Sequence, residues 1–115
     1  MANTFKVVTK AGVTTLDTIY TAASGTTTII LGLVLGNTTS GQTTATVTLS
    51  SDTANRAGAN NEANQDVELV TDAPIPSGSS LELLAGNKVV LEASDELKVS
   101  AGAATDVCLS IMEIT

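Results

Sequence analysis

The 115-residue chain contains no histidine and no tryptophan, and Phe5 and Tyr20 are its only aromatic residues, 2% of the sequence. Without histidine, no serine or cysteine has the base that usually activates a nucleophile, and no G-x-S-x-G motif occurs. Without tryptophan, the chain lacks the best aromatic platform for a sugar ring. We therefore expect a protein that is not an enzyme, with no catalytic residues and no cofactor.

Positive charge is also scarce. Five Lys and Arg residues stand against twelve Asp and Glu residues, which gives a net charge of −7. The five basic residues are scattered, whereas binding to nucleic acid or to an anionic membrane needs clustered Lys and Arg. We expect neither partner, and the acidic surface favours solubility.

The chain has a single cysteine, so an internal disulfide is impossible. Cys108 falls in an apolar segment, where a free cysteine usually behaves as a small buried hydrophobe, and we expect it to be structural. Residues 1–10 lack the apolar core of a signal peptide, and no run reaches the roughly 18 apolar residues of a membrane span. We therefore expect a protein that is made and kept in a cytoplasm until lysis or assembly.

What the chain does contain is Thr, Val, Ile and Leu in short alternating segments, which are typical of β-strands. Residues 28–37 (TIILGLVLGN) are the most apolar stretch. In residues 43–50, Ala45, Val47 and Leu49 alternate with threonines. We interpret these two segments as a central hairpin closed by the loop at residues 37–42.

Further short strands are expected on both sides of this hairpin. They lie at residues 5–9, 13–20, 65–70, 81–83, 89–92, 97–100 and 106–114, with the first two joined at Ala11-Gly12. The segment 13–20 has no cleanly apolar face, which favours an edge position. The pattern predicts one domain over residues 1–115: an all-β, antiparallel, jelly-roll-like β-sandwich with a long polar loop at about 51–64. A small closed β-barrel is the alternative, and in either fold the core must consist of Val, Ile, Leu and Ala.

Two groups of acidic and amide side chains are candidate binding or catalytic sites. The polar loop offers oxygen ligands for calcium, but not in EF-hand order, and we interpret these residues as solvated, with cation binding left open. They are Asp52, Asn60, Asn61, Glu62, Asn64 and Asp66. Glu92, Asp95 and Glu96 flank a tight turn and are expected to point into solvent rather than form a glycosidase pair. We predict no metal site.

The last segment, residues 106–114, is apolar on both faces. Val107, Leu109 and Ile111 form one face, whereas Cys108, Met112 and Ile114 lie on the other. Such a strand should lie inside a sheet or against a partner, so we expect a homo-oligomer or a partner-bound protein. Val70, Leu84 and Val90 lie opposite the predicted core face and would form an interface if they cluster. The alternative, that the sandwich covers them internally, stays open.

Two stretches resemble small virion structural proteins of tailed bacteriophages. They are residues 18–48, TIYTAASGTTTIILGLVLGNTTSGQTTATVT, and residues 73–100, APIPSGSSLELLAGNKVVLEASDELKVS. The resemblance implies a small β-sandwich module that decorates the capsid or builds neck, tail or fibre attachments. It implies that the loop at 37–41 and the Ile75-Pro76-Ser77-Gly78 corner define the fold rather than bind a ligand, and it brings no catalytic residues.

The combined hypothesis is a non-enzymatic structural protein of a phage virion, assembled in the host cytoplasm. Its leading form is a capsid decoration or cement protein that contacts the major capsid protein or other virion proteins. A neck, tail or fibre component is the alternative within this class. A carbohydrate- or receptor-binding module is a third, for which Tyr20 and Phe5 would be the stacking residues.

Overall fold

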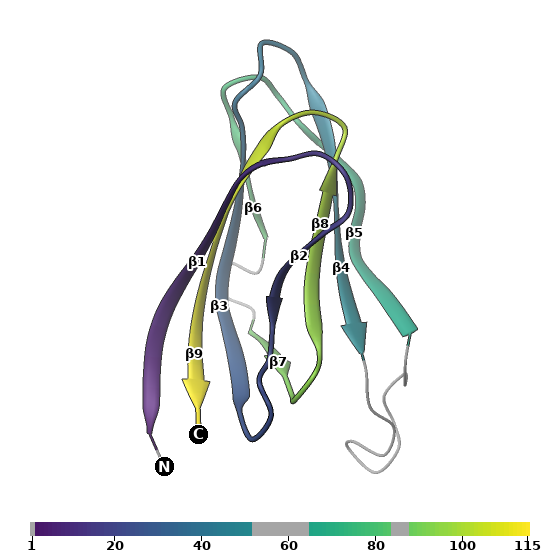
Figure 1. Ribbon diagram of the computed structural model, residues 1–115. Helices are drawn as coiled ribbons and strands as arrows, with labels where there is room; N and C mark the ends of the chain where they lie inside the picture. The colour runs from purple at the N-terminus through teal and green to yellow at the C-terminus, as the bar shows by residue number, and fades with distance from the viewer. Residues whose placement is uncertain (1, 52–64, 84–87) are drawn as a thin grey trace.

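The computed structural model describes residues 2–51, 65–83 and 88–115, and within them all regular secondary structure is β-strand (Figure 1). The strands are β1 Asn3–Val13, β2 Asp17–Thr21, β3 Thr27–Asn37, β4 Thr43–Ser51, β5 Gln65–Ile75, β6 Ser80–Leu83, β7 Val89–Leu91, β8 Glu96–Ala101 and β9 Thr105–Ile114. The predicted all-β class is confirmed. Apart from Ser51 and Asp66, the predicted polar loop and its candidate calcium ligands lie outside the described residues.

The strands form two antiparallel sheets that pack face to face. The first sheet has the order β1-β9-β3-β6, with β7 also paired to β3, and the second has the order β2-β8-β4-β5. The pairs are nested: β1 with β9, β2 with β8, β3 with β6 and β7, and β4 with β5. This nesting is the connectivity of a jelly roll, so the predicted sandwich is confirmed and, among the described strands, no barrel closes.

The predicted central hairpin is wrong. β3 and β4 lie in opposite sheets, so residues 38–42 cross from one sheet to the other instead of closing a hairpin. The predicted turn at Ala11-Gly12 is also wrong, because β1 continues through a register shift to Val13 before the chain crosses to β2. Alternation identifies a strand and its two faces, but it does not identify the strand's partner.

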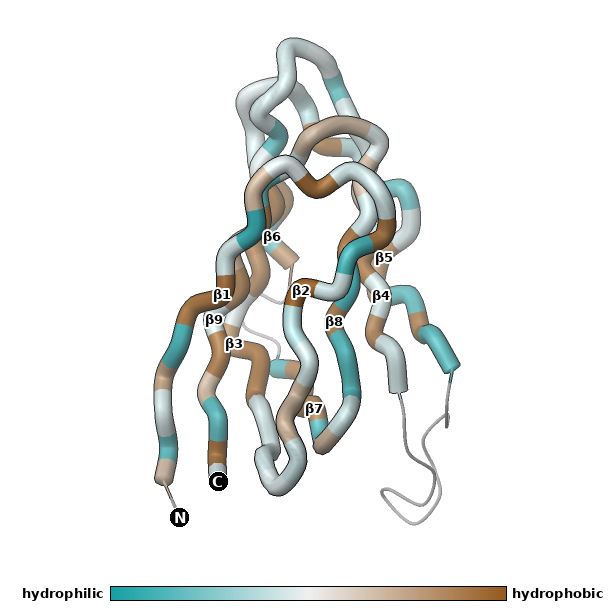
Figure 2. Tube along the Cα trace, in the orientation of Figure 1, coloured by the Kyte–Doolittle hydropathy of each residue, from teal (hydrophilic) through white to brown (hydrophobic). Residues whose placement is uncertain are grey.

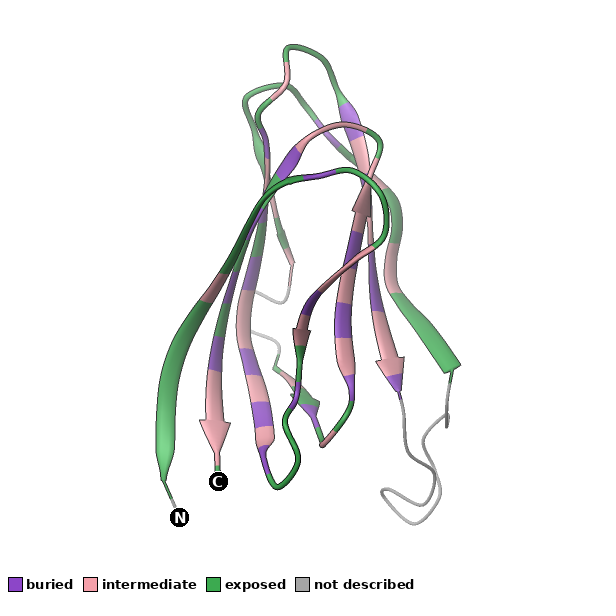
Figure 3. Ribbon diagram, in the orientation of Figure 1, coloured by how far each residue is buried: buried purple, intermediate pink, exposed green. Residues whose placement is uncertain are grey.

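The core between the sheets consists of aliphatic side chains, as predicted. Its buried members are Val13, Ile19, Ala22, Ile30, Leu33, Leu35, Ala45, Val47, Ile75, Leu91, Leu97, Val99, Val107, Leu109 and Ile111. The prediction for the last strand is confirmed as well. β9 lies inside the first sheet between β1 and β3, and it alternates buried and exposed residues from Thr105 to Ile111 (Figure 3).

The edges of the two sheets differ in regularity. β2 is an edge strand of the second sheet, as predicted. At the other edge, β5 carries Pro74 and two register shifts against β4. The shifts bring Val70 into register with the buried Val47, so Val70 packs against the core, not opposite it as predicted. β1, by contrast, is exposed along nearly all its length.

One buried asparagine joins two loops at the same end of the sandwich. The side-chain amide of Asn37 donates to the carbonyl oxygens of Gly41, at 2.8 Å, and Ile75, at 2.9 Å. Its oxygen accepts from the backbone NH of Thr39, at 2.9 Å, and from the hydroxyl of the same residue, at 2.7 Å. Ser77 adds a bond from its hydroxyl to the carbonyl oxygen of Thr39. The loop after β3 and the corner after β5 therefore hold each other.

Candidate protein–protein interface

A row of apolar side chains crosses the outward face of the first sheet. Phe5 pairs in register with Met112, Met112 with Ile29, and Ile29 with Val90, so four strands contribute one residue each. Residues in register share a face of the sheet. Ile111, the neighbour of Met112 along β9, is buried, which places this row on the side away from the core.

The rows beside it continue the same surface. Val7 faces Ser110, and Thr9, Cys108 and Val34 form the next row. Phe5 is 71% exposed, Val7 62% and Val90 54%. We call this surface the outer apolar face; it comprises Phe5, Val7, Ile29, Val34, Val90, Cys108, Met112 and Ile114.

The outward face of the second sheet is different. There Thr18 pairs with Lys98, and Thr46 pairs with Ser100. Sandwich strands usually alternate core residues with polar outward residues. The pairs above follow this rule in the second sheet, whereas in the first sheet apolar residues occupy many outward positions beside polar ones such as Ser110 and Glu82. The hydropathy along β1, β9 and β8 can be followed in Figure 2. The apolar row is therefore a property of one face, of the kind that marks an interaction site.

A hollow of about 380 Å³ lies at the end of the outer apolar face that carries Thr9, Val34 and Cys108. Thr9, Val34, Gly36, Asp106 and Cys108 contribute to its lining. Gly36 has no side chain to occupy this space. A Cβ at this position would fit, because its nearest neighbour would be the carbonyl oxygen of Asp106 at 4.0 Å, and a larger side chain here would fill the hollow. The backbone NH of Gly12 donates to the Asp106 carboxylate at 2.9 Å, which fixes the rim of the hollow.

The three residues predicted to form an interface lie in different places. Val90 is exposed and belongs to the outer apolar face, but Val70 packs against the core from the second sheet, and Leu84 lies outside the described residues. The prediction of a buried Cys108 is wrong: its side chain is exposed, because position 108 falls on the outward side of β9. Sequence reasoning missed Phe5 and Val7, whose alternation with Lys6 was the available signal.

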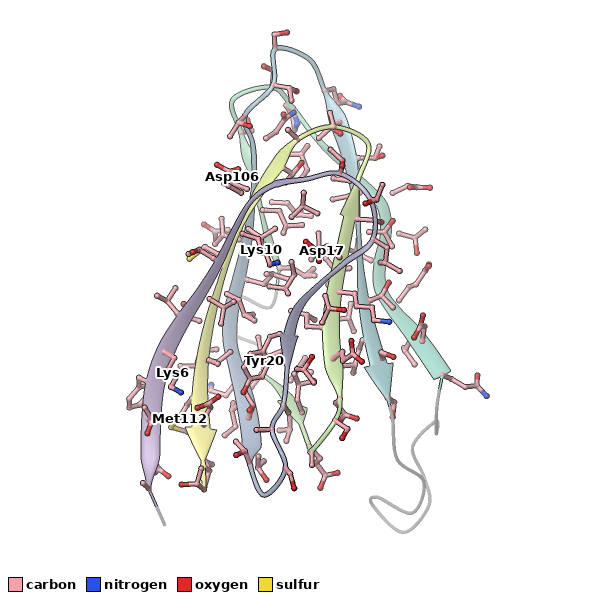
Figure 4. All side chains as sticks on the ribbon, viewed as in Figure 1. Lys6, Lys10, Asp17, Tyr20, Asp106 and Met112 are labelled. Atoms are coloured by element: carbon pink, nitrogen blue, oxygen red, sulfur yellow. The ribbon has the colours of Figure 1, made fainter. Side chains whose placement is uncertain are left out.

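Between the two sheets, four polar side chains form a chain of contacts, of which Figure 4 labels Lys6 and Tyr20. Lys6 Nζ lies 2.7 Å from Glu113 Oε1, and the Tyr20 hydroxyl donates to Glu113 Oε2 at 2.6 Å. The same hydroxyl lies 2.8 Å from the buried Thr28 Oγ1. These contacts tie β2, an edge of the second sheet, to β1, β9 and β3 of the first.

The pKa shifts of Tyr20 and Glu113 favour the hydrogen bond between them. Burial raises the pKa of Tyr20 above its ordinary value of 10.0, and the hydrogen bond to Glu113 adds to the rise. Hydrogen bonds from Lys6 and then from Tyr20 lower the pKa of Glu113 below its ordinary 4.5. Near neutral pH the phenol is therefore protonated and the carboxylate ionised, which is the pairing that the hydrogen bond needs.

Two carboxylates of the acidic turn at residues 92–96 accept hydrogen bonds from the protein itself. Asp95 does not point into solvent as predicted: it is 5% exposed, and its Oδ2 accepts the backbone NH of Glu92 at 3.0 Å. Glu96 accepts a hydrogen bond from the Thr18 hydroxyl at 3.0 Å. Across residues 2–51, 65–83 and 88–115, no three His, Cys, Asp or Glu side chains gather closely enough to hold a metal ion.

The described part of the chain contains no helix long and apolar enough to cross a membrane. No protein-family model matches the sequence, and no curated protein matches it. Among solved structures, a chain described under "Bacillus endospore appendages form a novel family of disulfide-linked pili" is similar at 16% sequence identity and a TM-score of 0.43. The match covers 96% of this chain and 85% of that one. A likeness of this size carries no argument about function.

Proposed function

We propose that the chain is a non-enzymatic structural protein that works by burying its outer apolar face against other proteins. The observation that carries this proposal is the row of Phe5, Met112, Ile29 and Val90 on one face of the sandwich. Burying apolar surface contributes about 25 cal/mol per Å², so a continuous row across four strands is a substantial source of binding energy.

The resemblance of residues 18–48 and 73–100 to small phage virion proteins gives the proposal its specific form. In that form the chain is a capsid decoration or cement protein in the virion, assembled in the host cytoplasm and bound to the major capsid protein. Its contacts add interface area and raise the barrier to capsid opening, and many bound copies add through mass action. A neck, tail or fibre component is the second candidate on the same resemblance.

The test is quantitative mass spectrometry of purified virions after heads and tails have been separated. We expect the chain in the head fraction at a fixed ratio to the major capsid protein. A Phe5→Ser, Val90→Ser variant should be lost from heads, whereas Leu16→Ser should remain, because Leu16 is 54% exposed but lies outside the outer apolar face. A few copies that travel with tails would refute decoration, and absence from the particle would refute a virion role.

A further inference from the structure

Phe5 is the most exposed large side chain of the outer apolar face and lies at one end of it. It is the chain's one phenylalanine, it is 71% exposed, and it lies on β1 beside Met112 of β9. An aromatic ring that projects from an apolar surface is the usual form of an interface anchor, provided that a pocket exists to receive it.

The hollow lies at the other end of the same face. Its lining includes Thr9, Val34, Gly36 and Cys108, together with Lys10 and Asp106. Phe5 and Thr9 are four residues apart on one strand, which corresponds to about 13 Å. Val7 lies midway between them. A two-fold axis that lies in the plane of the interface and crosses the strands at Val7 therefore brings Phe5 of each copy over the hollow of the other.

We propose that the outer apolar face, whose function as an interface is proposed above, is self-complementary and binds a second copy of this chain, with Phe5 of each copy inserted into the hollow of its partner. Two-fold interfaces of this kind use one surface patch twice, so every contact occurs in duplicate. The first sheets of the two copies then stack face to face.

The size of the face fits this occupant. The outward side of the first sheet has four strand positions about 4.8 Å apart, the fourth shared by the short strands β6 and β7. Over about eight residues at 3.3 Å it covers roughly 500 Å² per copy, or roughly 1,000 Å² for the pair. That value lies at the lower limit for a specific interface, so we expect a reversible dimer.

The net charge of the chain predicts how the strength of the dimer depends on salt concentration. Each copy carries a net charge of −7, whereas none of the eight residues of the outer apolar face is charged. Glu82 lies in register with Val34, and Lys10 and Asp106 line the hollow, so charged groups border these apolar residues. Two copies therefore repel each other at long range, and the apolar residues supply the attraction at contact. Salt screens the repulsion without weakening the apolar contact, so the dimer should become tighter as ionic strength rises.

The test is sedimentation equilibrium of the purified chain up to about 1 mM, which detects even weak dimers. Phe5→Ser removes the inserted ring, and Gly36→Val fills the hollow at a position that has room for a side chain. Each should raise the dimer dissociation constant about tenfold or more, as removal of an anchor does. Leu16→Ser is the matched control and should leave it unchanged, and far-UV circular dichroism confirms that each variant is folded.

Cys108 supplies an independent readout because it is exposed on the same face. Its labelling by a maleimide should slow as the wild-type concentration rises, and it should not slow for Phe5→Ser. A wild-type chain that remains monomeric, or a dimer that neither variant weakens, would overturn the proposal. Weakening by Phe5→Ser but not by Gly36→Val would overturn the insertion into the hollow.

These results separate the dimer from the virion role. A monomeric chain that is still bound to heads would refute self-association and leave the proposed function standing. A dimer with the expected variant effects, made by a chain that is absent from virions, would do the reverse.

Discussion

Replacement of Asn37 by alanine tests how the two loops at one end of the sandwich are held. The side chain is 3% exposed and uses both of its amide hydrogens and both of its acceptor positions. Asn37→Ala removes the four hydrogen bonds to Thr39, Gly41 and Ile75 at once. The carbonyl oxygen of Ile75, whose residue is fully buried, loses this donor.

The magnitude follows from these contacts. A buried polar group left without its partner costs about 1–3 kcal/mol, and each remaining hydrogen bond contributes about 0.5–1.5 kcal/mol net. The loop bonds near Gly41 are partly solvated, so water replaces part of their contribution. We expect Asn37→Ala to lower the free energy of unfolding by about 2–4 kcal/mol.

Urea denaturation followed by far-UV circular dichroism measures this change as a shift of the midpoint at constant slope. Asn37→Asp keeps the acceptor for Thr39 but places a carboxylate against two carbonyl oxygens, so it should lose at least as much stability. Thr38→Ala is the control, because its exposed hydroxyl makes one 3.3 Å bond, and it should cost less than about 0.5 kcal/mol. A loss below about 1 kcal/mol for Asn37→Ala would show that the loops do not depend on this side chain.

Three further substitutions test the core, the acidic turn at residues 92–96 and the hydrogen bonds of Tyr20. Leu109→Ala, at a fully buried position of β9, should lower the free energy of unfolding by about 2–5 kcal/mol, and a loss under 1 kcal/mol by urea titration would contradict the assigned core. Ser94→Gly should raise the thermal midpoint slightly, because Ser94 has a φ of 73° and glycine adopts that conformation without strain; a lower midpoint would count against a strained turn. Tyr20→Phe should cost about 1–2 kcal/mol at neutral pH, since Thr28 and Glu113 lose the hydroxyl. Because folding raises the pKa of Tyr20, the stability that this hydroxyl adds is complete below pH 10.0 and falls as the pH rises further. The difference in unfolding free energy between wild type and Tyr20→Phe, measured by urea titration, should therefore decrease above pH 10.0 and stay constant below it.

The sequence was sufficient for the class of fold because two signals agreed. The aliphatic composition left one possible core, and alternation in segments such as Ala45-Thr46-Val47 identified strands and their inward residues. The doubly apolar last strand lies inside a sheet as predicted, with one apolar face in the core and the other, which includes Cys108, outward. These are local properties, and they survive whatever partner the strand finds.

Partner choice was the information that the sequence did not supply. The hairpin predicted for β3 and β4 rested on a loop of turn-forming residues, but Asn37 uses its side chain to join that loop to Ile75, 38 residues further along. Asp95 is buried because its carboxylate accepts the backbone NH of Glu92 within the turn, and Cys108 is exposed because nothing in the described part of the chain covers the outward side of β9. The bulges of β5, which turn Val70 toward the core, are set by its register with β4 and leave no clear mark in the sequence.

The nested pairing has a consequence for when the proposed interface exists. β1 and β9 are the first and last strands, and their ends meet where Ala2 and Thr115 exchange backbone hydrogen bonds of 3.2 and 3.0 Å (Figure 1). Phe5 and Met112 therefore become neighbours only after the chain has been made through residue 112 and the long segment between them has closed into a loop, which is a late and entropically costly step. An unfinished chain presents Phe5 without Met112, Ile29 or the hollow beside Cys108. The surface that binds a partner is thus completed by the same step that completes the fold, so association through it requires a folded subunit.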